Sequence, residues 1–150
     1  MRRQAGLKWC LLMVVFFVLA CAACSSEPVS VDDVTGRWAL SAEVRQRLQI
    51  SAARAELTIN RDGTFQAVQV PADLLYVESG PLRTSSGSGR WRVADESGRD
   101  VLKLQFLEVE GSRRSPYSVS LYVTRRGEAA NLDYFSGDPD EGNVVSFSRQ

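Results

Sequence analysis

The sequence predicts an all-β protein, an eight-stranded antiparallel up-and-down barrel. Two observations indicate this fold. Beyond residue 35, apolar residues recur at every second position in eight short segments, and turn-forming Gly, Asp, Asn and Pro residues separate most of these segments. Strands that pair in chain order leave two open edges, which closure into a barrel removes. A partly open β-sandwich of the same strands is the alternative.

Each of the eight segments places its larger apolar side chains on one face, as expected for a sheet with one side in the core. The segments are 36–43, 55–60, 64–70, 89–94, 101–109, 117–124, 131–136 and 143–149. The second and third flank "RDG" at 61–63, a tight-turn signal in which Asp62 and Gly63 accept unusual backbone angles. The predicted inward residues include Trp38, Leu40, Ala42, Trp91, Val93, Leu102, Leu104, Phe106, Val119, Leu121, Val123, Leu132, Tyr134, Val145 and Phe147.

Two stretches depart from this alternation. Residues 44–55 space apolar positions at helical distance and predict a short helix or a wide loop. In 71–77, Pro71 precedes Asp73 near the start of a single helical turn, whose Leu74, Leu75 and Tyr76 are placed to plug one end of the barrel. The Ser- and Gly-rich stretch 78–89 predicts a mobile loop.

The stretch 1–20 has the features of a secretory signal peptide. Arg2, Arg3 and Lys8 precede an unbroken apolar run at 9–20, which ends in small residues. This run is too short to cross a hydrocarbon core as a helix, which needs roughly 20 residues. Removal of 1–20 leaves 15 Lys and Arg against 18 Asp and Glu, a net charge of −3. That balance argues against a nucleic-acid partner.

Two cysteines lie where the leader ends, in "VLACAAC" at 18–24. Two residues between thiols is the spacing of a redox motif, but redox cysteines lie at a helix start inside a folded domain. With Cys10 as the one other cysteine and no histidine in the chain, a zinc site of the usual four Cys and His ligands cannot be assembled. The stretch instead resembles the lipobox of bacterial lipoproteins.

That resemblance implies that one cysteine receives diacylglycerol and becomes the new amino terminus. Cys21 follows Val18, Leu19 and Ala20, whereas Cys24 follows Cys21, Ala22 and Ala23. We favour Cys21, because an apolar residue three positions back is the stronger requirement, and keep Cys24 as the alternative. Neither cysteine is followed by Asp, so the resemblance favours the outer membrane if the cell is Gram-negative.

The expected organisation is therefore a lipoprotein signal peptide at 1–20, a flexible tether at 21–33 and a barrel domain at 34–150. Residues 21–33 are small, polar and acidic, with no periodic apolar face. A flexible tether of this length reaches about 20 Å, so the domain is expected close to the membrane. The predicted location is the cell envelope, outside the cytoplasm, with the lipid anchor (palmitate among its acyl chains) in the membrane.

The barrel region also carries a resemblance. "TGRW" at 35–38 is similar to the Gly-x-Trp strand start of lipocalin-like proteins, and "LTINRDGTF", "VPADLL", "GSGRW" and "YFSGDPDEGNVVSF" extend the likeness over 36–149. In this order the motifs resemble those of small bacterial lipoproteins with a lipocalin-like β-barrel domain. The resemblance implies that Trp38 packs across the barrel floor and that a small apolar molecule or a lipid is the ligand.

Three groups of residues are candidates for chemistry, and each has a simpler structural explanation. Acidic residues in "GDPDEGN" at 137–143 have oxygen ligands suited to calcium but depart from the calcium-loop pattern, so a turn is favoured and no metal is predicted. Arginines on the predicted strands suit phosphate groups, or else form a solvated face paired with Glu56, Glu108 or Glu110. Aromatic residues line a ligand cavity or, more simply, fill the core. The acidic residues are Asp138, Asp140 and Glu141. The arginines are Arg90, Arg92, Arg113, Arg114, Arg125 and Arg126. The aromatic residues are Trp38, Trp91, Phe65, Phe106, Tyr134 and Phe147.

The expected function is that of a membrane-anchored, non-catalytic binding module without a cofactor. The chain has no histidine, no cysteine after residue 24 and no serine-nucleophile or phosphate-loop motif, so an enzyme is not predicted. The alternative is a filled barrel that contacts another envelope protein through its loops. The volume inside the barrel distinguishes the two, because a lumen of several hundred Å³ favours a ligand.

Overall fold

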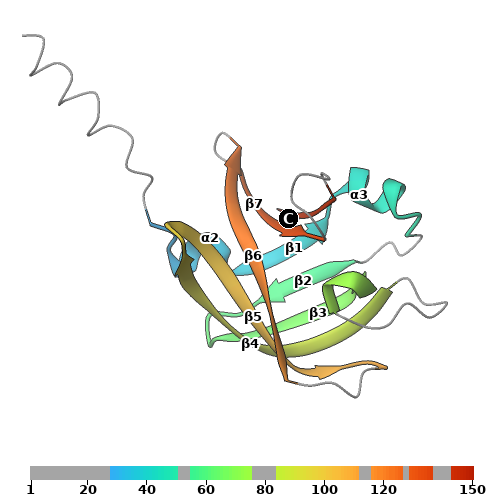
Figure 1. Ribbon diagram of the computed structural model, residues 1–150, viewed down its shortest axis with the longest axis horizontal. Helices are drawn as coiled ribbons and strands as arrows, with labels where there is room; N and C mark the ends of the chain where they lie inside the picture. Colours follow the sequence, from blue (N-terminus) through green and yellow to red (C-terminus); the bar gives the residue numbers. More distant parts are fainter. Residues whose placement is uncertain (1–27, 51–54, 76–83, 112–115, 127–128, 137–142) are drawn as a thin grey trace, which may run out of the picture.

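A computed structural model describes residues 28–50, 55–75, 84–111, 116–126, 129–136 and 143–150. Eight antiparallel strands form a closed up-and-down barrel, with each strand paired to its neighbours in the chain and β8 paired to β1 (Figure 1). The predicted fold class is confirmed. The elements are α2 (Val31–Val34), β1 (Gly36–Leu40), α3 (Ala42–Arg47), β2 (Glu56–Ile59), β3 (Thr64–Pro71), η1 (Ala72–Leu75), β4 (Thr84–Glu96), β5 (Arg99–Val109), β6 (Tyr117–Arg126), β7 (Ala129–Phe135) and β8 (Val144–Arg149).

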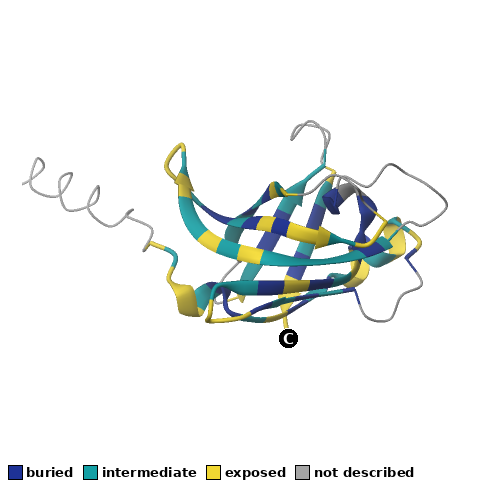
Figure 2. Cartoon of the chain, turned by 90° about the horizontal axis from the view of Figure 1, so that it is seen from below, coloured by how far each residue is buried: buried dark blue, intermediate teal, exposed yellow. Residues whose placement is uncertain are grey.

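The predicted alternation is present along the strands, where buried and exposed residues succeed one another (Figure 2). The inward side chains form one continuous apolar core, whose buried members run from Val34 to Phe147 in the chain. Trp38, Leu57, Leu104, Leu121 and Phe147 are each 0% exposed. A water-sized lumen next to these side chains would leave them measurable exposure, so the centre of the described barrel is filled.

Both ends of the barrel are covered. At one end Val34 of α2 packs into the core, and the indole nitrogen of Trp38 donates to the Val34 carbonyl at 2.8 Å. At the other end Leu74 and Leu75 of η1 are completely buried, and the Tyr117 hydroxyl donates to the Leu75 carbonyl at 2.5 Å. The predicted plug at 71–77 is thus confirmed for the leucines, while Tyr76 lies outside the described residues.

The seam between β1 and β8 is reinforced by Arg149. Its guanidinium donates to the Thr35 carbonyl at 2.7 Å and to the Asp32 carbonyl at 3.2 Å, and lies 5.8 Å from the centre of the Trp38 ring. One side chain therefore joins the last strand to α2 and to the floor of the core, an arrangement to which hydrogen bonding and cation–π attraction both contribute.

Three details differ from the sequence-based expectations. Ala42 is exposed at the start of α3 instead of facing inward, because Ser41 caps that helix and ends the strand at Leu40. Val31, Asp32 and Asp33, placed in the expected tether, belong to α2, which a capping box between Ser30 and Asp33 stabilises. In the β2–β3 turn Gly63 alone has positive φ, whereas the Asp62 carboxylate accepts hydrogen bonds from Thr64.

A fourth difference concerns the expected mobile loop at 78–89, of which 84–89 form the beginning of β4 and 78–83 lie outside the described residues. The glycines in this stretch are required by close packing. A Cβ on Gly87 would lie 3.0 Å from the Phe106 ring, and a Cβ on Gly89 would lie 1.9 Å from the Gln105 carbonyl oxygen. The register between β4 and β5 shifts between Ser88 and Gly89, so the missing side chains allow a bulge at this point of the strand pair.

We expect Gly89→Ala to destabilise the barrel by about 1–3 kcal/mol, because the added methyl group must push β4 away from the β5 backbone. Chemical denaturation of the wild type and the variant measures this difference in the free energy of unfolding. Ser88→Ala, at the neighbouring position of the same strand, is the matched control and should change little. Equal stability of the two variants would contradict the packing argument.

Candidate functional site

The pairing between β5 and β6 ends before the two strands do. Cross-strand pairing between β5 and β6 runs from Phe106–Tyr117 to Val101–Tyr122 and stops there. Beyond that point β5 pairs with β4 alone, and β6 pairs with β7 alone. The β4–β5 and β6–β7 hairpins therefore separate towards their tips, and the β4–β5 tip lies beside α2 (Figure 1).

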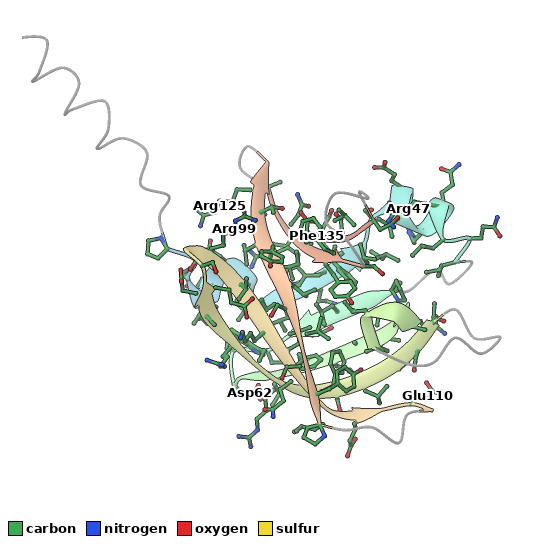
Figure 3. The ribbon with its side chains drawn as sticks, viewed as in Figure 1. Arg47, Asp62, Arg99, Glu110, Arg125 and Phe135 are labelled. Carbon is green, nitrogen blue, oxygen red and sulfur yellow. The ribbon has the colours of Figure 1, made fainter. Side chains whose placement is uncertain are left out.

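A cleft of about 390 Å³ lies between these two hairpins, and we call it the rim cleft. It lies within the size range of small-molecule sites. Figure 3 shows Arg99 and Arg125 between the two hairpins and Phe135 further along β7. The rim cleft is lined by Val29, Gly98, Arg99, Asp100, Tyr122, Val123, Thr124, Arg125 and Phe135.

The wall of the rim cleft includes an aromatic pair. The rings of Tyr122 and Phe135 meet edge to face, with their centres 5.3 Å apart and their planes at 75°. Both side chains belong to the outer face of the sheet, because their neighbours Leu121 and Tyr134 face the core. An edge-to-face pair holds both rings in fixed positions, so they offer a preformed apolar surface.

The charged groups of the rim cleft come from both hairpins and from the N-terminal segment. Arg125 pairs with Asp33 of α2 at 3.2 Å, and the Val29 amide donates to the Asp100 carboxylate at 2.9 Å. Hydrogen bonds from the Ser30 amide and hydroxyl, together with nearby Arg125, hold the pKa of Asp33 below its ordinary value. Among the described ion pairs none involves Arg99.

Beside the aromatic pair, a buried carboxylate fastens three strands to one another. Asp133 of β7 is 5% exposed and accepts the Thr124 hydroxyl of β6 at 2.7 Å and the Ser146 hydroxyl of β8 at 2.5 Å. No side-chain oxygen or nitrogen that is buried in the described chain lacks a partner. The Asp133 cluster is part of the wall behind Thr124 and fixes the spacing of the strands that carry Tyr122 and Phe135.

Among the arginines singled out in the sequence, those that the structure describes lie on different parts of the barrel. Arg90 and Arg92 are exposed on β4, and Arg125 lines the rim cleft, whereas Arg113, Arg114 and the side chain of Arg126 lie outside the described residues. Glu56, one of the three glutamates expected to pair with these arginines, is held by Arg37 through two bonds of 2.8 and 3.1 Å. Those two residues are adjacent on paired strands β1 and β2.

The six aromatic candidates belong to the core or pack against it, as the simpler explanation predicted. Trp38, Phe65, Phe106 and Phe147 are at most 2% exposed, and Trp91 and Tyr134 pack on the core from its edge. Phe65 meets Phe106 edge to face with ring centres 4.8 Å apart. These rings occupy the space that a ligand in the centre of the barrel would need.

Other expected sites fall outside the described residues. These are Cys21 and Cys24, the proposed lipidation positions, and Asp138, Asp140 and Glu141 of the acidic turn. Within the described chain, no three His, Cys, Asp or Glu side chains lie close enough together to hold a metal ion. The described helices are all too short or too polar to cross a membrane.

The sequence-based reasoning did not single out Arg99, Tyr122, Phe135 or Asp133 as a site. The sequence pattern marks them only weakly, because each occupies a position whose side chain is expected to point out of the barrel. One recognisable sign is that two aromatic residues stand at outward positions of neighbouring strands, where polar residues are the rule.

The fold and the site define a class of protein: a small closed β-barrel with a filled centre and an open cleft at its rim. No family model matches the sequence. Searches of curated proteins and of solved structures gave no match either.

We expect the stabilising effect of the Asp33 charge to depend on pH. Because its pKa is lowered in the folded state, the charge stabilises the fold above the ordinary Asp value of about 3.9, and this contribution disappears as the pH falls through the folded-state pKa. Asp33→Asn should lower the free energy of unfolding near pH 7 by less than about 1 kcal/mol, since the pair is partly exposed. Denaturation of the wild type and the variant from pH 7 to pH 2 should show this difference shrinking in acid, and a difference that stays constant would contradict the argument.

We also expect Asp133→Ala to cost about 1–3 kcal/mol, because the Thr124 and Ser146 hydroxyls lose a buried acceptor. Removing all three polar groups together, in Asp133→Ala with Thr124→Val and Ser146→Ala, should recover part of that loss. Urea denaturation of both proteins measures the comparison. A triple variant less stable by the sum of the single changes would show that the three groups do not act as one cluster.

Proposed function

We propose that this protein is a membrane-anchored envelope lipoprotein whose barrel is a non-catalytic binding domain. The observation that carries the proposal is the leader at 1–20 followed by cysteines at 21 and 24, which resembles a lipoprotein signal. Two or three acyl chains hold a protein on a membrane almost permanently, whereas a single chain does so marginally. The anchor is placed on Cys21, with Cys24 as the alternative, and the outer membrane is the favoured location in a Gram-negative cell.

The filled core directs the proposed binding to the surface of the barrel. Buried core side chains from η1 and from every strand except β4, with Trp91 and Val93 of β4 packed against them, leave the described centre without room for a small apolar ligand. This supports the alternative in which a filled scaffold presents its binding surface through loops and hairpins. The rim cleft is the surface best suited to the task, because it combines preformed rings with two arginines.

The anchor is tested by metabolic labelling with a clickable fatty acid, followed by fractionation of the envelope. Label should be lost in Cys21→Ser and retained in Cys24→Ser. Cys10→Ser is the matched control, since Cys10 lies inside the leader and should not matter. Loss in Cys24→Ser alone would move the anchor to the second cysteine.

Two results would contradict the anchor. Label that persists when Cys21 and Cys24 are both replaced would mean that neither carries the lipid. A wild-type protein without label would make the cysteines a thiol pair in a secreted protein. For the binding domain, native mass spectrometry and in-cell crosslinking of the mature protein should recover a retained small molecule or a specific envelope partner.

A further inference from the structure

We propose that the rim cleft binds the anionic headgroup of a phospholipid in the membrane that holds the anchor. This inference rests on the proposed function, because the lipid anchor is what brings the rim cleft to the membrane. It assigns the ligand chemistry to a negatively charged phosphate with an apolar glycerol and acyl portion. Three independent features of the described residues support it.

The first feature is the pair of guanidinium groups. Arg99 and Arg125 line the same cleft from separate hairpins, and a guanidinium donates two parallel hydrogen bonds to phosphate oxygens. The nearby carboxylates are already engaged: Asp33 accepts from Ser30 and pairs with Arg125, and Asp100 accepts from the Val29 amide. An incoming phosphate therefore meets cations whose neighbouring negative charges are partly satisfied within the fold.

The second feature is the apolar side of the rim cleft. Tyr122, Phe135, Val123 and Val29 lie in its lining beside the arginines. A free inorganic phosphate makes no use of such a surface, whereas the glycerol and first methylene groups of a phospholipid bury apolar area against it. The combination of rings and arginines in one cleft of about 390 Å³ fits an amphiphilic ligand with one charged end.

The third feature is the position of the rim cleft relative to the proposed anchor. Val29 lines the cleft, and only a short stretch of chain separates it from Cys24 and Cys21. A fully extended chain covers at most about 3.6 Å per residue, so the cleft lies within roughly 18 Å of an anchor on Cys24 or roughly 29 Å of one on Cys21. The η1 end of the barrel lies at the opposite side of the fold (Figure 1). Tethering at this distance keeps the lipid at a high effective concentration, so modest affinity is sufficient.

Residues 21–150 with Cys21→Ser and Cys24→Ser provide the test protein. This chain retains the whole buried core, which begins at Val34, and lacks the apolar leader. It is titrated by calorimetry with dihexanoyl phosphatidylglycerol, and with dihexanoyl phosphatidylcholine and inorganic phosphate as separate ligands, all below micelle-forming concentrations. We expect the phosphatidylglycerol to bind at least tenfold more tightly than either of the other two.

Matched variants locate the binding. Arg99→Gln with Arg125→Gln should weaken phosphatidylglycerol binding at least tenfold. Arg90→Gln with Arg92→Gln removes the same charge from the exposed face of β4 and should leave the dissociation constant within twofold. Circular dichroism and thermal melts establish that each variant is folded. Phe135→Ala should weaken the binding of phosphatidylglycerol and leave the binding of inorganic phosphate unchanged.

Several outcomes would overturn the proposal. Equal binding of the two phospholipids would remove the role of the negative charge. Equal binding of phosphate and phosphatidylglycerol would make a free anion the ligand, and equal losses in both arginine double variants would leave only a general charge effect. The titration measures the phospholipid affinity of a chain in which both cysteines are replaced, whereas fatty-acid labelling measures the acylation of those cysteines. Failure of the rim-cleft proposal and failure of the anchor are therefore distinguishable.

Discussion

The pairing of β1 with β8 is the contact on which the rest of the structure depends. It turns a sheet with two open edges into a closed barrel, and it brings Trp38 opposite Arg149. Trp38 then bonds to Val34 through its indole nitrogen, and Arg149 bonds to the carbonyls of Thr35 and Asp32. Closure of the sheet, burial of the floor and docking of α2 are consequently one event, and the N-terminal wall of the rim cleft follows from it.

The filled centre and the rim cleft both follow from how far the strands pair along their length. Over most of their length the strands face a core with no space left, so the barrel acts as a rigid support. Past Val101 and Tyr122 the barrel divides into two hairpins, and the polar and aromatic side chains between them line the rim cleft. Asp133 keeps β6, β7 and β8 at a fixed spacing beneath this division, which preorganises the surface above it.

The sequence was sufficient to predict the class of fold because half-buried strands carry their own signal. Segments such as 101–109 alternate so regularly that both their type and their inward face could be assigned. The beginning of β4 escaped prediction because Gly87 and Gly89 have no side chains to alternate, and the reason for them is the proximity of Phe106 and Gln105. The four-residue helix α2 is shorter than any periodic pattern can reveal, and its capping box lies in a stretch that otherwise resembles a tether.

The candidate site was less predictable than the fold for a different reason. Arg125 was noted among several arginines, but its neighbours depend on where the β5–β6 pairing ends, which is a property of three-dimensional register. Asp133 looks like any outward polar residue in the sequence, and its burial arises from packing across three strands. Glu56 likewise finds Arg37 because β1 and β2 pair in a register that no local pattern reveals.

The closure of the barrel also has a consequence for how the chain folds. All other strand pairs join consecutive segments, whereas Arg149 reaches a carbonyl 114 residues earlier in the chain. Local hairpins form before such a distant contact, because the entropy of closing the long loop must be overcome first. Until β8 arrives, β1 keeps one edge without a partner and Trp38 lacks Arg149 above it. Nascent chains are thus most exposed to mispairing with one another just before their final strand is added.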